Sequence, residues 1–144
     1  MVLELVQRLK MVELFWLGAV QKAEKYYQPS TLYSMNTLET LKSSRDFQKA
    51  KVGLFFRSKS FLLQAFKDET INKIRVGYTV SKQNGNAVVR NKIKRRLRVI
   101  AKNIIGKYGT NKWNYVIIGK KNSLIEDFKN LEIEMSKAIK KIHN

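Results

Sequence analysis

The chain has 144 residues, enough for one domain or for one domain with a tail, and 44% of them are hydrophobic, which argues against general disorder. It contains no cysteine, so disulfide frameworks and thiolate metal sites are excluded. Its 29 Lys and Arg residues against 11 Asp and Glu residues give a net charge of +18, which indicates a polyanionic partner, nucleic acid first and an anionic membrane surface second.

The N-terminal segment, residues 1–34, differs in charge from the rest of the chain. It carries four basic and three acidic side chains, whereas residues 35–144 hold the remaining net charge of +17. Apolar spacing predicts an amphipathic helix over residues 3–26, ending near Pro29. We therefore expect a domain over residues 35–144 and an N-terminal extension over residues 1–34, which is a loosely docked helix or sequence upstream of a start codon at Met35. A membrane-surface or partner-binding helix is the alternative.

The domain opens with a predicted helix and two strands. Apolar positions in residues 38–47 predict a short helix, which Ser43 or the serine after it can cap and which Gly53 ends. Alternating apolar side chains then predict strands over residues 61–66 and 74–81.

A long helix follows these strands. Gly85 marks a turn, and Asn86 is a plausible N-cap for a helix over residues 87–105 that glycines from position 106 onward close.

The chain ends with a third predicted strand and a last helix. Residues 113–119 read as a buried strand, and apolar residues at helical spacing predict a helix over residues 125–142. The order α-β-β-α-β-α around one core predicts an α+β fold, an α/β sandwich in which helices cover a central, mostly antiparallel sheet.

The long helix concentrates the positive charge. Six of the nine residues from Arg90 to Arg98 are basic, and no acidic residue lies between Lys82 and Lys112. An apolar stripe at three- and four-residue steps can dock on the sheet: Val89, Ile93, Leu97, Ile100 and Ile104. Like charges four residues apart destabilise an isolated helix by about 0.2–0.5 kcal/mol per pair, and bound phosphates would offset this repulsion.

The nature of the partner follows from this surface. The alternative is a basic face that contacts only solvent and binds no partner, but solvated faces normally mix both signs of charge. DNA is disfavoured because the apolar stripe anchors the helix along its length and no short helix precedes it in a helix-turn-helix arrangement. A broad basic surface suits structured RNA, which proteins recognise through phosphates and 2′-hydroxyl groups.

Two consecutive segments resemble one protein family. Residues 75–82 read R-V-G-Y-T-V-S-K, and residues 85–98 read G-N-A-V-V-R-N-K-I-K-R-R-L-R. A strand followed in this order by an Arg-Asn helix strongly resembles the protein subunit of bacterial ribonuclease P, and residues 41–47 and 61–64 also fit that family. The resemblance covers about residues 38–142 and looks most like the alphaproteobacterial branch.

The resemblance implies a fold and a function. The fold is the one that ribonuclease P proteins share with the second domain of a small-subunit ribosomal protein. The function is that of an accessory subunit of an endoribonuclease, which removes the 5′ leader from precursor transfer RNA in the bacterial cytoplasm. The expected partners are the ribonuclease P RNA and precursor tRNA, with no membrane and no obligate protein partner.

Catalysis is expected to belong to the RNA subunit. The resemblance implies Mg²⁺ for the RNA-containing holoenzyme, with no cofactor bound by the protein alone. The only histidine, His143, is next to last, and no carboxylate cluster or metal-ligand spacing appears. We therefore expect no catalytic and no metal-binding residue in the protein.

The resemblance also assigns residues to two surfaces. The residues expected to contact the RNA subunit are Lys82, Arg90, Asn91, Lys92, Lys94, Arg95 and Arg98. The residues expected to bind the leader, in a cleft between the first helix and the sheet, are Phe47, Lys51, Leu62 and Gln64.

The sequence departs from the family pattern at three of these positions. Lys51 and Gln64 stand where many relatives have aromatic rings, and Lys92 replaces the third residue of an Arg-Asn-Arg signature. Because stacking a base on a ring contributes about 1–3 kcal/mol, we expect weaker stacking and a more salt-sensitive leader contact.

Some alternatives stay open. Phe47 can be an ordinary core residue, and Trp113 and Tyr115 are expected in the core rather than on a stacking surface. The whole protein can instead be a non-catalytic RNA-binding module, such as a ribosomal protein or an assembly factor. A peripheral membrane protein that uses residues 1–34 is the third hypothesis.

Overall fold

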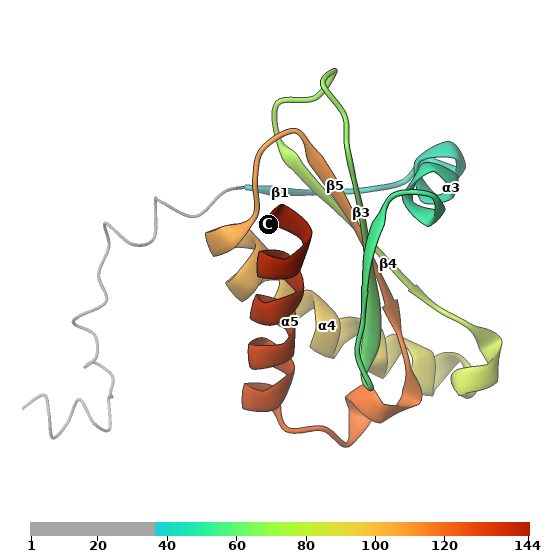
Figure 1. The fold of residues 1–144 in the computed structure, drawn as a ribbon. Helices are drawn as coiled ribbons and strands as arrows, with labels where there is room; N and C mark the ends of the chain where they lie inside the picture. The colour runs from blue at the N-terminus through green and yellow to red at the C-terminus, as the bar shows by residue number, and fades with distance from the viewer. Residues whose placement is uncertain (1–36) are drawn as a thin grey trace, which may run out of the picture. The chain divides into compact units, whose positions relative to one another are not determined.

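The computed structural model describes residues 37–144, and the predicted N-terminal extension with its helix lies outside them. Within the described residues, five strands form one sheet: β1 (Leu38–Thr40), β2 (Leu54–Arg57), β3 (Phe61–Lys67), β4 (Ile74–Val80) and β5 (Trp113–Gly119). The helical elements of this part are α3 (Ser44–Lys51), α4 (Ala87–Tyr108), α5 (Phe128–His143) and two short 3-10 helices, η2 (Lys82–Asn84) and η3 (Lys121–Leu124). Figure 1 shows the sheet nearly edge-on, with α4 and α5 on one side and α3 on the other.

The sheet combines parallel and antiparallel pairs. Its strand order is β1-β4-β5-β3-β2, so β5, the last strand in the sequence, lies at the centre. The pairs β1-β4 and β4-β5 are parallel, whereas β3-β5 and β2-β3 are antiparallel. The α+β class is confirmed, but the expectation of a mostly antiparallel sheet holds for only half of the pairs. The pair β4-β5 is parallel because α4 connects the two strands as a crossover helix.

The main core lies between the sheet and the pair α4 and α5. Each helix turns one apolar side toward the sheet because its apolar residues recur every three or four positions. Fully buried members of this core include Phe61, Leu63 and Ala65 of β3, Tyr115 and Ile117 of β5, Ile93, Leu97 and Ile100 of α4, and Leu131 and Met135 of α5. Burying each large apolar side chain contributes about 1.5–3 kcal/mol, so this layer holds α4 firmly against the sheet.

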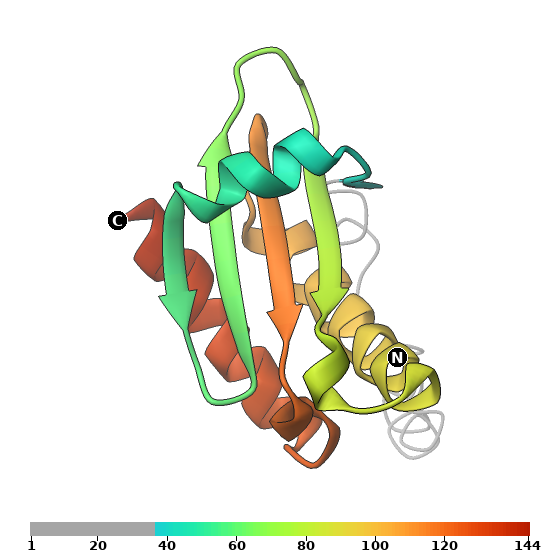
Figure 2. The same ribbon diagram turned by 90° about the vertical axis from the view of Figure 1, so that its right-hand side faces the viewer.

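A smaller cluster lies on the other face of the sheet. Leu41, Ala50 and Val116 are buried there, and Phe47 packs against them. Figure 2 shows α3 crossing this face near one end of the strands, with no helix over the other end.

The predicted order of the longer elements is confirmed, while β1 and β2 are additions. With three and four residues, these two strands are too short to show an alternating pattern. Leu38 therefore belongs to β1 instead of the predicted first helix, which is limited to α3. Ser43 occupies the N-cap position of α3, but its side chain makes no capping hydrogen bond.

The two long helices differ from prediction at one end each. α4 continues through Gly106, which is buried, and stops at Gly109. α5 starts at Phe128 rather than near Ile125, because Asp127 caps it by accepting a hydrogen bond from the Lys129 N–H at 3.1 Å. No helix within residues 37–144 combines the length and the apolar character needed to cross a membrane.

Candidate nucleic-acid interface

The first turn of α4 is fixed by a local network. The Asn86 side chain accepts a hydrogen bond from the Val89 N–H at 3.0 Å, which confirms the predicted N-cap. Gly85 has φ +131°, a region that favours glycine, and a Cβ there would lie 2.9 Å from Val89 Cγ1. The Arg90 Nε–H donates to the Gly85 carbonyl at 3.2 Å. The turn at Gly85 and the side chain of Arg90 are therefore fixed relative to each other.

The inner side of α4 confirms the predicted apolar stripe. Ile93, Leu97 and Ile100 are fully buried, while Val89 and Ile104 are half-buried at its two ends. The helix is anchored over several turns, so its outer side has a fixed position relative to the sheet.

The residues expected to contact the RNA subunit lie together on η2 and the first half of α4. Lys82, Asn91, Lys92, Arg95 and Arg98 are exposed, and Arg90 and Lys94 are half-buried. We call these seven residues the α4 cationic surface. Within residues 37–144, none of its six cations forms an ion pair with a carboxylate, since the four ion pairs found there involve other side chains. The surface therefore offers its charge to an external anion.

Arg98 also has an intramolecular contact with an aromatic ring. Its guanidinium lies 5.2 Å from the centroid of the Tyr78 ring on β4. Burial raises the pKa of Tyr78 to about 12, although the positive charge of Arg98 opposes this rise. Tyr78 is therefore a neutral phenol at physiological pH, and its ring positions Arg98 without removing its charge.

Arg96 belongs to the same basic run but has a different place. Its guanidinium lies 4.5 Å from the centroid of the Phe128 ring, and it donates a hydrogen bond to the Glu126 carbonyl. Arg96 therefore connects α4 to the start of α5. The sequence could not show this role, because both contact partners are far from Arg96 along the chain.

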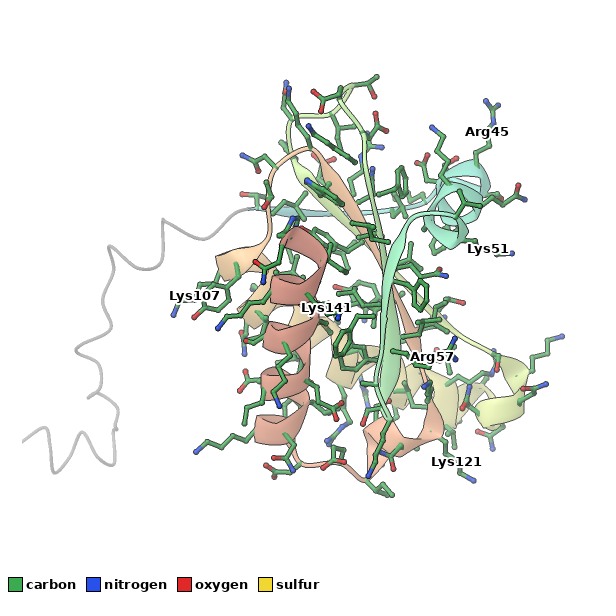
Figure 3. The ribbon with its side chains drawn as sticks, viewed as in Figure 1. Arg45, Lys51, Arg57, Lys107, Lys121 and Lys141 are labelled. Carbon is green, nitrogen blue, oxygen red and sulfur yellow. The ribbon has the colours of Figure 1, made fainter. Side chains whose placement is uncertain are left out.

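The positive charge is not limited to α4. Figure 3 shows Arg45 and Lys51 projecting from α3, with Arg57 on the same side of the sheet, while Lys107 and Lys141 lie on the side of α4 and α5. Positive charge therefore lies on both sides of the sheet, so an anionic partner can contact the α3 side as well as the α4 and α5 side.

The residues expected to bind the leader lie around α3 and β3. Leu62 and Gln64 of β3 are half-buried and point to the face that carries α3, because their neighbours Phe61, Leu63 and Ala65 are buried on the other face. Phe47 is half-buried on this face and lies over Gly77 of β4. Lys51 is exposed at the last turn of α3. Phe47, Leu62 and Gln64 thus share one face of the sheet, with Lys51 beside it.

Strand register defines the rest of this face. Gln64 lies opposite Phe55 of β2 and opposite Val116 of β5. Leu62 lies opposite Arg57 and Ile118, and Ile118 lies opposite Thr79. Residues directly opposite each other point to the same face. We call the part of the face not buried beneath α3 the open sheet face: Phe55, Arg57, Leu62, Gln64, Thr79 and Ile118.

Four of these residues were not assigned to a site from the sequence: Phe55, Arg57, Thr79 and Ile118. Phe55 and Arg57 lie on β2, which was not predicted, and both are exposed. The run Leu54 to Arg57 between Gly53 and Ser58 was the available signal, because three consecutive large apolar residues bounded by turn formers are typical of a short strand.

Trp113, Tyr115 and His143 have structural roles. Tyr115 is fully buried and Trp113 packs against the main core, as predicted. The Tyr115 hydroxyl lies 2.6 Å from His143 Nε2, and burial raises the pKa of Tyr115 to about 12. Residues 37–144 contain no group of three or more His, Cys, Asp or Glu side chains that could hold a metal ion.

Comparisons of sequence identify relatives of the chain. The family model Ribonuclease P matches residues 35–143. The ribonuclease P protein component of Ruegeria pomeroyi is 36% identical over 109 residues, which cover 74% of this chain and 87% of that protein. That of Erythrobacter litoralis is 32% identical over 101 residues, covering 70% and 83%. Ruegeria is alphaproteobacterial, in agreement with the branch that the sequence resembles.

Solved structures give the same result for the fold. The ribonuclease P protein from Thermotoga maritima matches with a TM-score of 0.61 and 28% identity, covering 72% of this chain and 97% of that chain. The Staphylococcus aureus ribonuclease P protein matches with a TM-score of 0.60 and 28% identity, covering 73% and 97%. The family model and the two bacterial relatives confirm the resemblance to the ribonuclease P protein subunit. The chain therefore belongs to the family of ribonuclease P protein components, the accessory protein subunits of a ribonucleoprotein that processes transfer RNA.

Proposed function

We propose that this protein binds the RNA subunit of ribonuclease P through the α4 cationic surface and the 5′ leader of precursor tRNA through the open sheet face. The RNA subunit cleaves the leader, and the protein supports cleavage by holding both RNAs. The complex works in the cytoplasm of a bacterium.

The α4 cationic surface carries the proposal. Five of its six cations lie along α4, which a buried apolar stripe fixes to the sheet, and the sixth, Lys82, precedes α4 on η2. No carboxylate of residues 37–144 forms an ion pair with any of them. Each phosphate that such a cation contacts releases condensed counterions and gains a charge-assisted hydrogen bond. A folded RNA provides closely spaced phosphates over the roughly 12 Å that separate Arg90 from Arg98 along the helix axis.

The open sheet face supports the second part of the proposal. It combines apolar surface at Leu62 and Ile118 with the amide of Gln64, and Phe47 borders it. Single-stranded RNA binds such surfaces by placing bases on apolar or aromatic side chains while cations contact its backbone. Lys51, at the end of α3, is the cation that we assign to a leader phosphate.

The protein supplies no reacting group in this proposal. The resemblance to ribonuclease P proteins implies that the RNA subunit holds the catalytic metal ions. We therefore assign the Mg²⁺ of the holoenzyme to the RNA subunit.

Reconstitution tests the proposed function directly. The protein is mixed with a bacterial ribonuclease P RNA, and cleavage of precursor tRNA is measured at a magnesium concentration at which the RNA alone is nearly inactive. We expect cleavage to be restored, because cations on the protein replace part of the metal-ion screening between the two RNAs. Cleavage that remains at the level of the RNA alone would overturn the proposal that this protein supports cleavage by the RNA subunit.

The leader surface is tested by Phe47→Leu, which keeps apolar volume in the smaller cluster but removes the aromatic ring. We expect the affinity of the holoenzyme for precursor tRNA to fall about fivefold or more, since a stacked base contributes about 1–3 kcal/mol. Affinity for mature tRNA should stay the same. Equal weakening for both substrates would contradict a leader-binding role for Phe47.

A further inference from the structure

Phe55 is an exposed aromatic side chain on the edge strand β2. Its side chain is 60% exposed, and within residues 37–144 its ring contacts no other ring and no cation. By contrast, Phe128, the other exposed phenylalanine of this part of the chain, has the guanidinium of Arg96 over its ring. A single exposed apolar side chain is common on protein surfaces, so the neighbours of Phe55 on the sheet decide whether it belongs to a binding surface.

Strand register places Phe55 on the open sheet face. β2 pairs with β3 so that Phe55 lies directly opposite Gln64, and Arg57 lies opposite Leu62. Phe56 between them packs against the main core on the other face. The ring of Phe55 and the amide of Gln64 are therefore neighbours, with Cβ atoms about 4.5–5.5 Å apart as in any directly opposed pair.

This neighbourhood has the chemistry of a nucleotide site. A phenyl ring stacks on any base, and the Gln64 amide offers both a donor and an acceptor to the edge of a base. Arg57 lies two residues further along β2 on the same face, about 7 Å away, which is within reach of the phosphate of the same nucleotide. Within residues 37–144 Arg57 has no ion pair with a carboxylate.

The positive charge around this site favours RNA over a protein strand as the binding partner. Arg45, Lys51 and Arg57 project on the same side of the sheet (Figure 3), and the one acidic side chain of α3, Asp46, is paired with Arg75 at 3.7 Å. We propose that Phe55 and Arg57 form a nucleotide subsite on the edge strand β2, in which Phe55 stacks on an unpaired base of the leader and Arg57 contacts its phosphate. The subsite rests on the proposed leader-binding role of the open sheet face, and it supplies the aromatic ring that positions 51 and 64 lack.

The stacking contact is tested with precursor tRNAs that carry the fluorescent base 2-aminopurine at successive leader positions. In the wild-type holoenzyme we expect fluorescence quenching at one position where the base stacks on Phe55. Phe55→Leu should abolish the quenching at that position and weaken precursor binding about fivefold or more, while Phe55→Tyr should keep both. Leu54→Ala is the matched control, because Leu54 is 50% exposed on the same strand but points to the other face.

The outcomes separate the subsite from the proposed function. If the wild-type holoenzyme binds the precursor no better than mature tRNA, the leader-binding proposal fails and the subsite fails with it. If the wild type prefers the precursor but Phe55→Leu behaves like the wild type or like Leu54→Ala, only the subsite is wrong. Arg57→Ala should lower the salt dependence of precursor binding by about one phosphate contact, and an unchanged salt dependence would overturn its assignment. Melting temperatures of all variants establish that each domain is folded.

Discussion

The ring of Phe47 lies directly against the backbone of Gly77. A Cβ atom at position 77 would be 2.7 Å from Phe47 Cζ and 2.9 Å from Cε1, closer than carbon atoms approach without displacement. Gly77 is therefore what allows α3 to lie close to β4 and places the Phe47 ring beside the open sheet face. This contact joins the strand and the helix on either side of the proposed leader site.

Gly77→Ala should displace Phe47 and α3. We expect the free energy of unfolding to fall by about 1–3 kcal/mol, which is typical when a methyl group is forced into a packed site. Binding of precursor tRNA should weaken more than binding of the RNA subunit, since α4 lies on the other face. Urea denaturation and the two binding measurements check this prediction. Thr79→Ala, on the same strand and face but outside the Phe47 contact, should have little effect on stability.

Removing two cations of the α4 cationic surface should weaken binding of the RNA subunit. For Arg90→Ala combined with Arg95→Ala, we expect a steep loss of affinity, and the slope of log K against log salt should become shallower by up to about two units. Filter binding at several salt concentrations measures both quantities. Lys107→Ala combined with Lys141→Ala removes the same charge on the α4–α5 side shown in Figure 3. An equal effect of this control pair would mean that net charge, rather than the α4 surface, determines binding.

The stability of the domain should depend on the protonation of His143. Burial lowers the pKa of His143 below its ordinary value of 6.5, and the ring lies against Trp113 and Tyr115. The fold thus favours neutral His143, whereas the unfolded chain binds a proton below about pH 6.5. The stabilising contribution is complete above that pH and is lost as the pH falls through and below it.

Melting temperatures at pH 7.5 and pH 5.5 test this dependence. The wild type should lose more stability over this interval than His143→Gln, which has no group that titrates there. Hydrogen bonds to Lys73, Thr70, Lys67 and Asn130 lower the pKa of the carboxyl groups of Glu39, Asp68, Glu69 and Glu126, respectively. These carboxyl groups contribute little to the change in stability between pH 7.5 and pH 5.5, because their ordinary pKa values are only 3.8 to 4.5 and they stay ionised over this interval. Identical losses in both proteins would exclude His143 as the cause.

Asn114 should be replaceable by an apolar residue without loss of stability. It is fully buried on β5, and neither its side-chain nitrogen nor its side-chain oxygen has a hydrogen-bond partner among residues 37–144. An unpartnered buried amide costs about 1–3 kcal/mol. We expect Asn114→Leu to raise the free energy of unfolding by about 1 kcal/mol in urea denaturation. A clear loss of stability would indicate that the amide has a partner, such as a bound water.

The long elements and the exposed outer side of α4 were predictable from the sequence for physical reasons. The apolar stripe from Val89 to Ile104 and the alternation from Phe61 to Ala65 are long enough to define which side is buried. Asn86 marks the start of α4 through its cap. The cations of α4 could be placed on the outer side as soon as the inner side was known.

Other features depend on contacts between distant residues and could not be predicted. Arg96 looks like its basic neighbours in the sequence, but its contacts with Phe128 and Glu126 connect it to the start of α5. The position of Phe55 on the open sheet face depends on the register between β2 and β3. The parallel pairing of β4 and β5 likewise depends on how α4 returns across the sheet.

The central place of β5 has a consequence for how the chain folds during synthesis. Strands β3 and β4 are consecutive in the sequence, but β5 lies between them. A nascent chain that ends before Trp113 therefore holds two separate strand pairs, β1 with β4 and β2 with β3, and cannot join them. Non-local pairings of this kind slow folding, so the emergence of β5 and α5 from the ribosome is the step at which the two halves become one cooperative domain.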